Sequence, residues 1–411
     1  MLISEQSLFQ RFFQAYAASR SLHPRELRAA RCIADCGTRA MGAHVLSCPE
    51  GACEQLQFHA CRHRSCPRCA QSCRSRWIEA ELQRLLPCPH WHIVVTLPHE
   101  LLPLWSFNRA RLTSLFMRCV RESLLELLRQ PRYRGAPAGV IPGLLMSLHT
   151  WGRTLSQHPH VHCLLSSGGI DASGLWRDLP SGWVVPVRVL QALLRGKLLT
   201  ALGHELRLPR WIWPPAPTPS AWPPLLRRLW RKHWNVEIRG PYAHGRGVVL
   251  YLARYAKGAP LPPQRFLQLL EHDTQPQLRM PYLDHRSGTH RTLSLSVQEF
   301  IARVLWHAPA PGIHTTRHAG LYTAAHRSHH RAALQQLAHR STPTSWPRSC
   351  SSTRSQPVPC PHCQQPMLRT RLLKPWRNVA RPAAHRTGEF APRRINNGTL
   401  RTQRGPTGRS S

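Results

Sequence analysis

The apolar and polar positions in the middle of the chain alternate in ways that predict several strands and helices. Strands are predicted at 92–97, 144–151, 160–166, 234–239, 277–283 and 289–295. Helices are predicted at 77–86, 109–129, 186–202, 247–257 and 297–306. The order of one strand, one helix and two strands is typical of an α+β sandwich with an antiparallel sheet.

Two of these strands are predicted to form a hairpin. Residues 144–151 and 160–166 follow each other closely, and Gly168 and Gly169 close the pair. Residues 209–224, crowded with Pro and Trp, are predicted to be an irregular connection.

Both ends of the chain lack this regular pattern. Between Cys32 and Cys73 cysteines are dense and apolar periodicity is poor, as in a small domain that a metal stabilises. Beyond Ser341 the chain is rich in Ser, Thr, Pro and Arg, which predicts a basic and mostly disordered tail.

The charge of the chain narrows the class of partner. Its 411 residues carry a formal net charge of +37, and only four of its 56 basic residues are lysines. A field of this sign attracts polyanions, and the planar guanidinium suits phosphate oxygens, so nucleic acid is the expected partner. No apolar run is long enough to cross a bilayer and the first residues do not form a signal peptide, so we expect a cytoplasmic protein without membrane partners.

A His-x-His motif is the first candidate site. His160 and His162 fall on one face of the predicted strand, since side chains alternate along a strand, and two such imidazoles can share one divalent cation. His149 ends the preceding strand and can supply a third ligand across the hairpin. His158 and Gln157 compete for that place, and the sequence leaves the choice open.

Two tyrosines form the second candidate site. Tyr251 and Tyr255 are four residues apart on a predicted helix, so both hydroxyls project from the same face and either can reach one bound phosphate. Arg254 and Lys257 alternate with them. Because a phenol with a pKa of about 10 is a poor nucleophile at neutral pH, it needs a metal-polarised phosphate or a nearby base.

The cysteine-rich segment is the third candidate site. In a reducing compartment, thiolates spaced in this way indicate structural zinc, which prefers four tetrahedral N or S ligands. The sequence does not decide which thiolates share an ion. The predicted ligands are Cys36, Cys48, Cys53, Cys61, Cys66 and Cys69. Near the other end, Cys360 and Cys363 form a half-site with no evident second pair, which favours a chance occurrence or a degraded zinc knuckle.

Several motifs together resemble one known family, the two-tyrosine rolling-circle transposases of bacterial insertion sequences in the HUH endonuclease superfamily. The resemblance covers roughly residues 20 to 325. The motifs are Cys61-Arg-His-Arg-Ser-Cys-Pro-x-Cys69, Thr96-Leu-Pro-His-Glu-Leu101, Leu148-His-Thr-Trp-Gly152, His158-Pro-His-Val-His-Cys163, Tyr251-Leu-Ala-Arg-Tyr-Ala-Lys-Gly258 and the residues from Phe300 to Gly320 that include Arg317.

The resemblance implies an HUH nuclease sandwich preceded by a small zinc-binding domain. It implies an N-terminal helix and zinc-binding domain at 1–80, a catalytic domain at 87–325 and the tail at 341–411. The paired histidines are then ligands of Mn²⁺ or Mg²⁺, and the two tyrosines are nucleophiles. Arg254, Lys257 and Arg317 are expected to bind DNA.

The implied activity is nicking and joining of single-stranded DNA at insertion-sequence ends through a 5′-phosphotyrosine intermediate. The protein is then nucleoid-associated and can form a homo-oligomer. Two alternatives stay open. One is a replication initiator or relaxase of the same superfamily, and the other is a catalytically inactive zinc DNA-binding relic.

Overall fold

The computed structural model describes residues 1–130, 139–179, 186–261, 266–271, 275–284, 287–338 and 357–376, apart from the side chain of Tyr255. Within these residues the fold is α+β, and every strand pair is antiparallel. The predicted fold class is therefore confirmed at this level.

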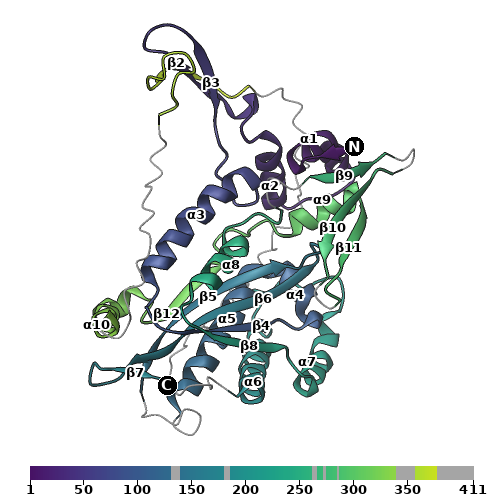
Figure 1. Ribbon diagram of the computed structural model, residues 1–411. Helices are drawn as coiled ribbons and strands as arrows, with labels where there is room; N and C mark the ends of the chain where they lie inside the picture. The colour runs from purple at the N-terminus through teal and green to yellow at the C-terminus, as the bar shows by residue number, and fades with distance from the viewer. Residues whose placement is uncertain are drawn as a thin grey trace, which may run out of the picture. The chain divides into compact units, whose positions relative to one another are not determined.

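The strand that carries the His-x-His motif, β6, is the central strand of the largest sheet (Figure 1). Its strands run in the order β12-β5-β6-β4-β8, and β7 pairs with the C-terminal end of β6. Their bounds are β4 His90–Thr96, β5 Ile141–Trp151, β6 Gln157–Ile170, β7 Trp176–Asp178, β8 Val236–Tyr242 and β12 Thr316–Gly320.

Strand alternation gives this sheet two different faces. On one face apolar side chains pack against α5 (Arg109–Arg129), α6 (Val187–Glu205) and α7 (Trp222–Arg231), which form the main core. On the other face α8 (Arg246–Ala256) contacts β5 and the long helix α3 (Pro67–Arg84). The histidines of β5 and β6 alternate with core residues, so they face α8.

The predicted hairpin is present, but Gly168 and Gly169 do not close it. β6 continues through both glycines and pairs there with β7. A Cβ on Gly169 would lie 2.4 Å from the carbonyl oxygen of Ile141, and one on Gly168 would lie 2.4 Å from the ring of Trp176. These glycines allow close approach of neighbouring strands instead of ending one.

A second sheet, β1-β9-β10-β11, joins the start of the chain to residues near 300. Phe9 and Phe300 are fully buried in its core. Its strands are β1 Leu2–Ile3, β9 Leu267–Leu270, β10 Gln277–Leu283 and β11 His290–Ser296, covered by α1 Glu5–Ala18, α2 Pro24–Asp35 and α9 Val297–Trp306.

A third sheet, β13-β2-β3, corrects part of the tail prediction. β2 (Ala43–Ser47) and β3 (Glu54–Phe58) form a hairpin, and β13 (Leu368–Leu373) pairs with β2. Residues 357–376 are therefore folded. The pairing with β2 gives hydrogen-bond partners to backbone N–H and C=O groups of β13, and a prediction from composition does not take this pairing into account. The rest of the predicted tail lies outside the described residues.

The remaining helices complete the fold. They are α4 (Leu102–Phe107) and α10 (Arg327–Ala338). The sequence did not predict α7, whose Pro-rich first turn resembles the irregular stretch before it. Among the described residues, none of the helices combines the length and the apolar composition that crossing a membrane requires.

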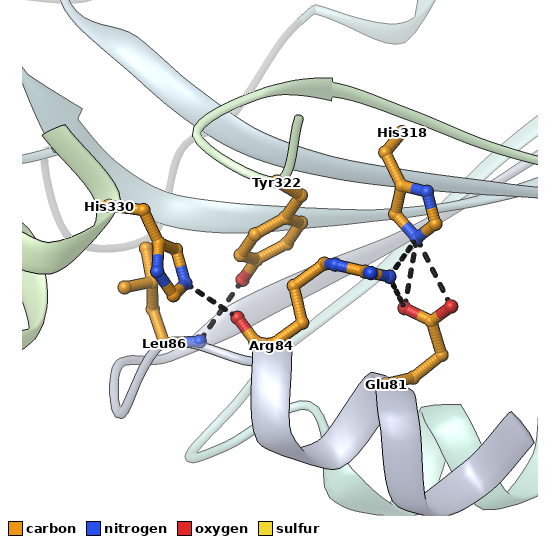
Figure 2. Close-up of polar contacts among 6 residues, drawn as sticks. All are labelled: Glu81, Arg84, Leu86, His318, Tyr322 and His330. Carbon is orange, nitrogen blue, oxygen red and sulfur yellow. Dashed lines mark hydrogen bonds and ion pairs between the residues drawn. The ribbon is translucent and has the colours of Figure 1, made fainter. Parts of the chain in front are cut away.

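Buried polar contacts attach α3 to the largest sheet (Figure 2). The Glu81 side chain is 5% exposed; it accepts a hydrogen bond from Arg84 Nη1 at 3.0 Å and lies 2.9 Å from Nε2 of His318, on β12. Arg84 Nη1 also lies 2.8 Å from His318 Nε2. At the end of α3, the backbone carbonyl of Arg84 accepts a hydrogen bond from the His330 side chain of α10. The Tyr322 hydroxyl accepts a bond from the Leu86 N–H at 3.4 Å and lies 2.6 Å from His90 Nε2. Helix α3 is thereby fixed beside the face that α8 covers.

We expect Glu81→Ala to lower the free energy of unfolding by about 2 kcal/mol, because it removes the buried carboxylate that contacts both Arg84 and His318. Denaturant unfolding monitored by tryptophan fluorescence measures the change. Glu79→Ala is the matched control on the same helix and should cost less than about 0.5 kcal/mol. Equal effects of the two variants would contradict the role of Glu81.

Candidate functional site

Four histidines from three neighbouring strands gather on the face of the largest sheet that α8 covers. His149 of β5 is the direct antiparallel partner of His160 of β6, and His162 lies one alternate position further along β6. His92 of β4 is the neighbour of His162 on the other side, with 5.0 Å between ring centroids. The predicted facing of His149 toward the His-x-His pair is confirmed.

Three of these imidazoles form a candidate metal centre. In His149, His160 and His162, the candidate ligand nitrogens all lie within 4.8 Å of one another. His160 Nδ1 donates to the carbonyl of His158 at 2.6 Å, which leaves its Nε2 lone pair available. The Nε2 atom of His162 is buried with no hydrogen-bond partner among the described residues, as expected for a nitrogen that binds a cation.

His92 orients one of the three. Its Nε2 lies 2.7 Å from His162 Nδ1. If the His162 Nδ1–H donates to His92, the Nε2 atom of His162 faces the other two rings as a lone pair. Metal-ligating histidines commonly have their second nitrogen fixed in this way.

Burial keeps these imidazoles neutral. It lowers the pKa of His160 and of His92 to about 4 each. The pKa values of His149 and His162 are also lowered, first by burial and then by the neighbouring histidines. Near pH 7 the rings therefore offer lone pairs, which a divalent cation requires.

The structure also places the two competitors for the third ligand position. Gln157 accepts a hydrogen bond from Ser106 at 2.9 Å. The His158 side chain is exposed and lines a separate pocket with Pro98 and Trp234. Only His149 joins His160 and His162 in one group among the described residues.

Tyr251 lies beside this histidine group. Its ring centroid is 5.6 Å from that of His162, 6.0 Å from His92 and 6.4 Å from His149. The side chain is 40% exposed, so a ligand can reach it from solvent. Helix α8 ends at Ala256, just before the predicted stop at Gly258. Only glycine fits at position 258, because a Cβ there would lie 1.8 Å from the carbonyl oxygen of Arg254.

The second tyrosine is placed only by its backbone. Tyr255 lies on α8 one turn after Tyr251. Its side chain lies outside the described part of the structure. The expectation that both hydroxyls share one face therefore stays a prediction.

Two pockets with basic linings lie on this side of the molecule, and Tyr251 lines one of them. One, of about 450 Å³, is lined by Tyr251, His92, Arg239 and His244. The other, of about 550 Å³, is lined by Arg254 together with Arg74, Trp151 and Tyr282. Arg153 lines both, so it forms a link between them.

The other predicted DNA-binding residues are divided between the two faces of the sheet. Lys257, at the end of α8, is half-buried, and burial with the nearby Arg64 guanidinium lowers its pKa. Arg317 pairs with Met146, a core residue, so it points to the face opposite the histidines, where it donates to Ser114 of α5 at 2.7 Å. The structure therefore does not bring Arg317 to the histidine group.

The six predicted zinc ligands separate into two groups. Four cysteines come together where α2 ends and α3 begins, with sulfur atoms within 4.8 Å of one another: Cys36, Cys61, Cys66 and Cys69. The Cys61 sulfur accepts a hydrogen bond from the His63 N–H at 3.4 Å, and the Cys69 sulfur accepts one from the Arg62 N–H at 3.2 Å. Such bonds suit thiolates bound to a metal.

The remaining two predicted ligands, Cys48 and Cys53, lie at the tip of the β2–β3 hairpin. They face Cys360 and Cys363. The expectation that Cys360 and Cys363 have no second pair is therefore wrong, since Cys48 and Cys53 lie beside them. The second pair lies some 300 positions earlier in the chain, where a local search of the sequence cannot find it.

Sequence reasoning missed two residues of this region. His92 belongs to a second His-x-His motif, formed with His90, and strand alternation could have identified it. Arg64 of the cysteine-rich segment reaches the face of the sheet that carries the histidines, where its charge adds to burial in lowering the pKa of His149. No local signal in the sequence indicates that contact.

Comparisons with known proteins agree with this arrangement. A family model described as "Putative transposase" matches residues 143–330, and one described as "Transposase zinc-binding domain" matches residues 8–97. The chain is 30% identical over 357 residues to "Putative transposase y4qJ" of Sinorhizobium fredii, covering 82% of this chain and 84% of that protein. It is 32% identical over 290 residues to "Transposase for insertion sequence element IS801" of Pseudomonas savastanoi pv. phaseolicola, covering 69% and 67%. No solved structure matches the chain.

Proposed function

Because this chain belongs to the insertion-sequence transposases of the IS91 and IS801 type, we propose that it cuts and rejoins single-stranded DNA with Tyr251 as a nucleophile. The observation that carries the proposal is the convergence of Tyr251 with three histidines on one face of the sheet. This arrangement supports an HUH-type nuclease assignment.

The residues that would hold the catalytic cation are His149, His160 and His162. A bound Mn²⁺ or Mg²⁺ would withdraw charge from a non-bridging oxygen of the scissile phosphate. Three nitrogen ligands favour Mn²⁺ over Mg²⁺. His92 keeps the His162 ring in the orientation that points its Nε2 atom at the cation.

The chemical step exchanges one phosphate ester for another. The Tyr251 oxygen attacks phosphorus and forms a 5′-phosphotyrosine bond, while the bond from phosphorus to the 3′-oxygen of the preceding nucleotide breaks. The phenolic proton passes to water, and the 3′-oxygen takes up a proton. Because the ester energy is kept, the reverse attack by a 3′-hydroxyl rejoins a strand without ATP. Tyr255 would act on the second strand end.

The DNA strand is proposed to run from the pocket that Tyr251 lines into the second pocket, which shares Arg153 with it. Arg239 and His244 line the first pocket and Arg254 the second, with Arg153 between them. Guanidinium groups bind phosphate oxygens, and rings such as Trp151 provide stacking surfaces for unpaired bases. Arg317 would contact DNA only on the opposite face.

Cys36, Cys61, Cys66 and Cys69 are proposed to hold the structural zinc of the zinc-binding domain. Their loop continues into Arg64, which reaches the catalytic face. A zinc ion there would fix the position of that arginine.

The test is incubation of the full-length protein with a labelled single-stranded oligonucleotide of the element end and Mn²⁺. We expect a covalent protein–DNA adduct on a denaturing gel, with the label retained only when it lies 3′ of the cut, and no adduct in EDTA. No adduct with any single strand would support an inactive DNA-binding relic. Adduct formation with a plasmid origin and not with element ends would support a replication initiator or relaxase.

A further inference from the structure

The hairpin tip of the third sheet carries a second set of four cysteines. Cys48 directly follows β2 and Cys53 directly precedes β3. Cys360 and Cys363 lie on a turn eight and five residues before β13. The two cysteine pairs are about 300 positions apart in the sequence. Residues 360 and 363 lie outside the two regions that the family models match.

Three of the four sulfur atoms form one close group, and Cys53 joins it through Cys360; two of the four cysteines are buried and two are partly exposed. The Cys48 and Cys363 sulfurs are 3.4 Å apart, and those of Cys53 and Cys360 are 3.6 Å apart. Cys48, Cys360 and Cys363 all lie within 4.8 Å of one another. Cys360 is fully buried and Cys48 is 5% exposed, packed with Leu46 and Met367.

These distances fit a metal better than disulfides. A disulfide requires a sulfur separation of about 2.05 Å. Tetrahedral zinc with Zn–S bonds of about 2.3 Å places its sulfurs roughly 3.8 Å apart. Both measured separations are close to the second value.

Each pair is held by a tight turn of its own. The Cys48 N–H donates to the Cys53 carbonyl at 2.9 Å, and the Gly51 N–H donates to the Cys48 carbonyl at 3.0 Å. On the other side the Cys360 N–H donates to the Gln365 carbonyl at 2.8 Å. The two turns therefore bring Cys48 close to Cys363 and Cys53 close to Cys360.

The second turn repeats a feature of the first cysteine group. The His362 N–H donates to the Cys360 sulfur at 3.4 Å, as the His63 N–H does to the Cys61 sulfur. Backbone donors two residues after a cysteine stabilise a thiolate, the form that zinc requires. The same local geometry thus occurs at both cysteine groups.

We infer that Cys48, Cys53, Cys360 and Cys363 bind a second structural zinc ion, which fastens residues 357–376 to the β2–β3 hairpin. Besides the pairing of β13 with β2, the side-chain contacts include Ser47 with Thr370 at 2.7 Å, Arg369 with Gln57 at 3.3 Å and an exposed ion pair of Arg371 with Glu54. Exposed pairs contribute little, and such a small apolar cluster rarely folds alone, so a zinc ion would add substantially to the stability of this sheet. The inference is independent of the catalytic proposal, because zinc content is measured without DNA.

The experiment measures zinc per chain by plasma mass spectrometry in full-length protein dialysed free of loose metal. We expect the double variant Cys360→Ser/Cys363→Ser to hold one zinc ion fewer than wild type. The matched control Cys73→Ser lies outside both groups and should retain the wild-type content. Equal zinc in the double variant and the control overturns the proposal.

Two further measurements distinguish loss of a zinc ligand from misfolding, and a zinc site from a pair of disulfides. Cys363→His replaces a sulfur ligand with a nitrogen ligand, so it should keep the zinc that Cys363→Ser loses; loss in both overturns the proposal. In denaturant without reductant, all 14 cysteines should react with a thiol reagent. A count of four fewer would show two disulfides instead of zinc and also overturns it.

Discussion

Tyr251→Phe is expected to reduce covalent adduct formation with single-stranded DNA by at least roughly 10³-fold, since removal of a nucleophile typically costs this much or more. The physical reason is that the phenylalanine ring keeps the packing and loses only the attacking oxygen. Tyr251 is the residue chosen because its ring lies 5.6 Å from that of His162. The measurement is the initial rate of adduct formation, followed by peptide mapping of the wild-type adduct.

Tyr242→Phe is the matched control. Tyr242 lines the same pocket and is 40% exposed, as Tyr251 is, but it lies on β8 and not on α8. We expect its adduct rate to stay within about threefold of wild type. A wild-type rate in Tyr251→Phe, or mapping of the adduct to Tyr242, would refute the nucleophile assignment. Adduct that remains in Tyr251→Phe and disappears on adding Tyr255→Phe would assign the first attack to Tyr255.

The second large effect is expected for His162→Ala. Removing this ligand leaves two imidazoles for the cation, and metal stabilisation of the transition state is worth several kcal/mol, so cleavage should fall by roughly 10³-fold. Mn²⁺ affinity should fall by about 10-fold or more. Titration of Mn²⁺ by electron paramagnetic resonance measures binding, and the oligonucleotide assay measures cleavage.

His158→Ala is the control for this variant. Its ring lies 4.9 Å from that of His160 but is not part of the group, and the contact it gives His160 comes from its backbone carbonyl, which alanine retains. Mn²⁺ binding and cleavage should therefore be unchanged. If His158→Ala is as damaging as His162→Ala, the third ligand position belongs to His158 and not to His149.

Matched folding of these variants is needed for the comparison. The histidines lie on strands whose other face forms the main core, so alanine at 162 removes no apolar packing from that core. Unfolding midpoints within a few degrees of wild type would show that the loss is chemical. This separates them from Glu81→Ala, whose expected effect is on stability alone.

The local pattern of the chain determined much of this protein. Helices 109–129 and 297–306 were predicted with the bounds that the structure has, because a buried stripe repeats at the helical period. Alternation along a strand put His160 and His162 on one face, and the position of His149 at the end of its strand placed it opposite the pair. These relations depend on residues within about 20 positions of one another.

The tertiary structure decided what depends on distant segments. It placed His149 and not His158 in one group with His160 and His162, brought His92 from another strand, and turned Arg317 to the opposite face. It also divided the cysteines between two groups and supplied Cys360 and Cys363 to the second. The period of the sequence pattern predicts on which face of a strand a side chain lies, but it does not predict which other strand lies beside that strand. That choice depends on sheet order and on closing loops of 70 to more than 300 residues, whose entropic cost only the complete packing of the chain offsets.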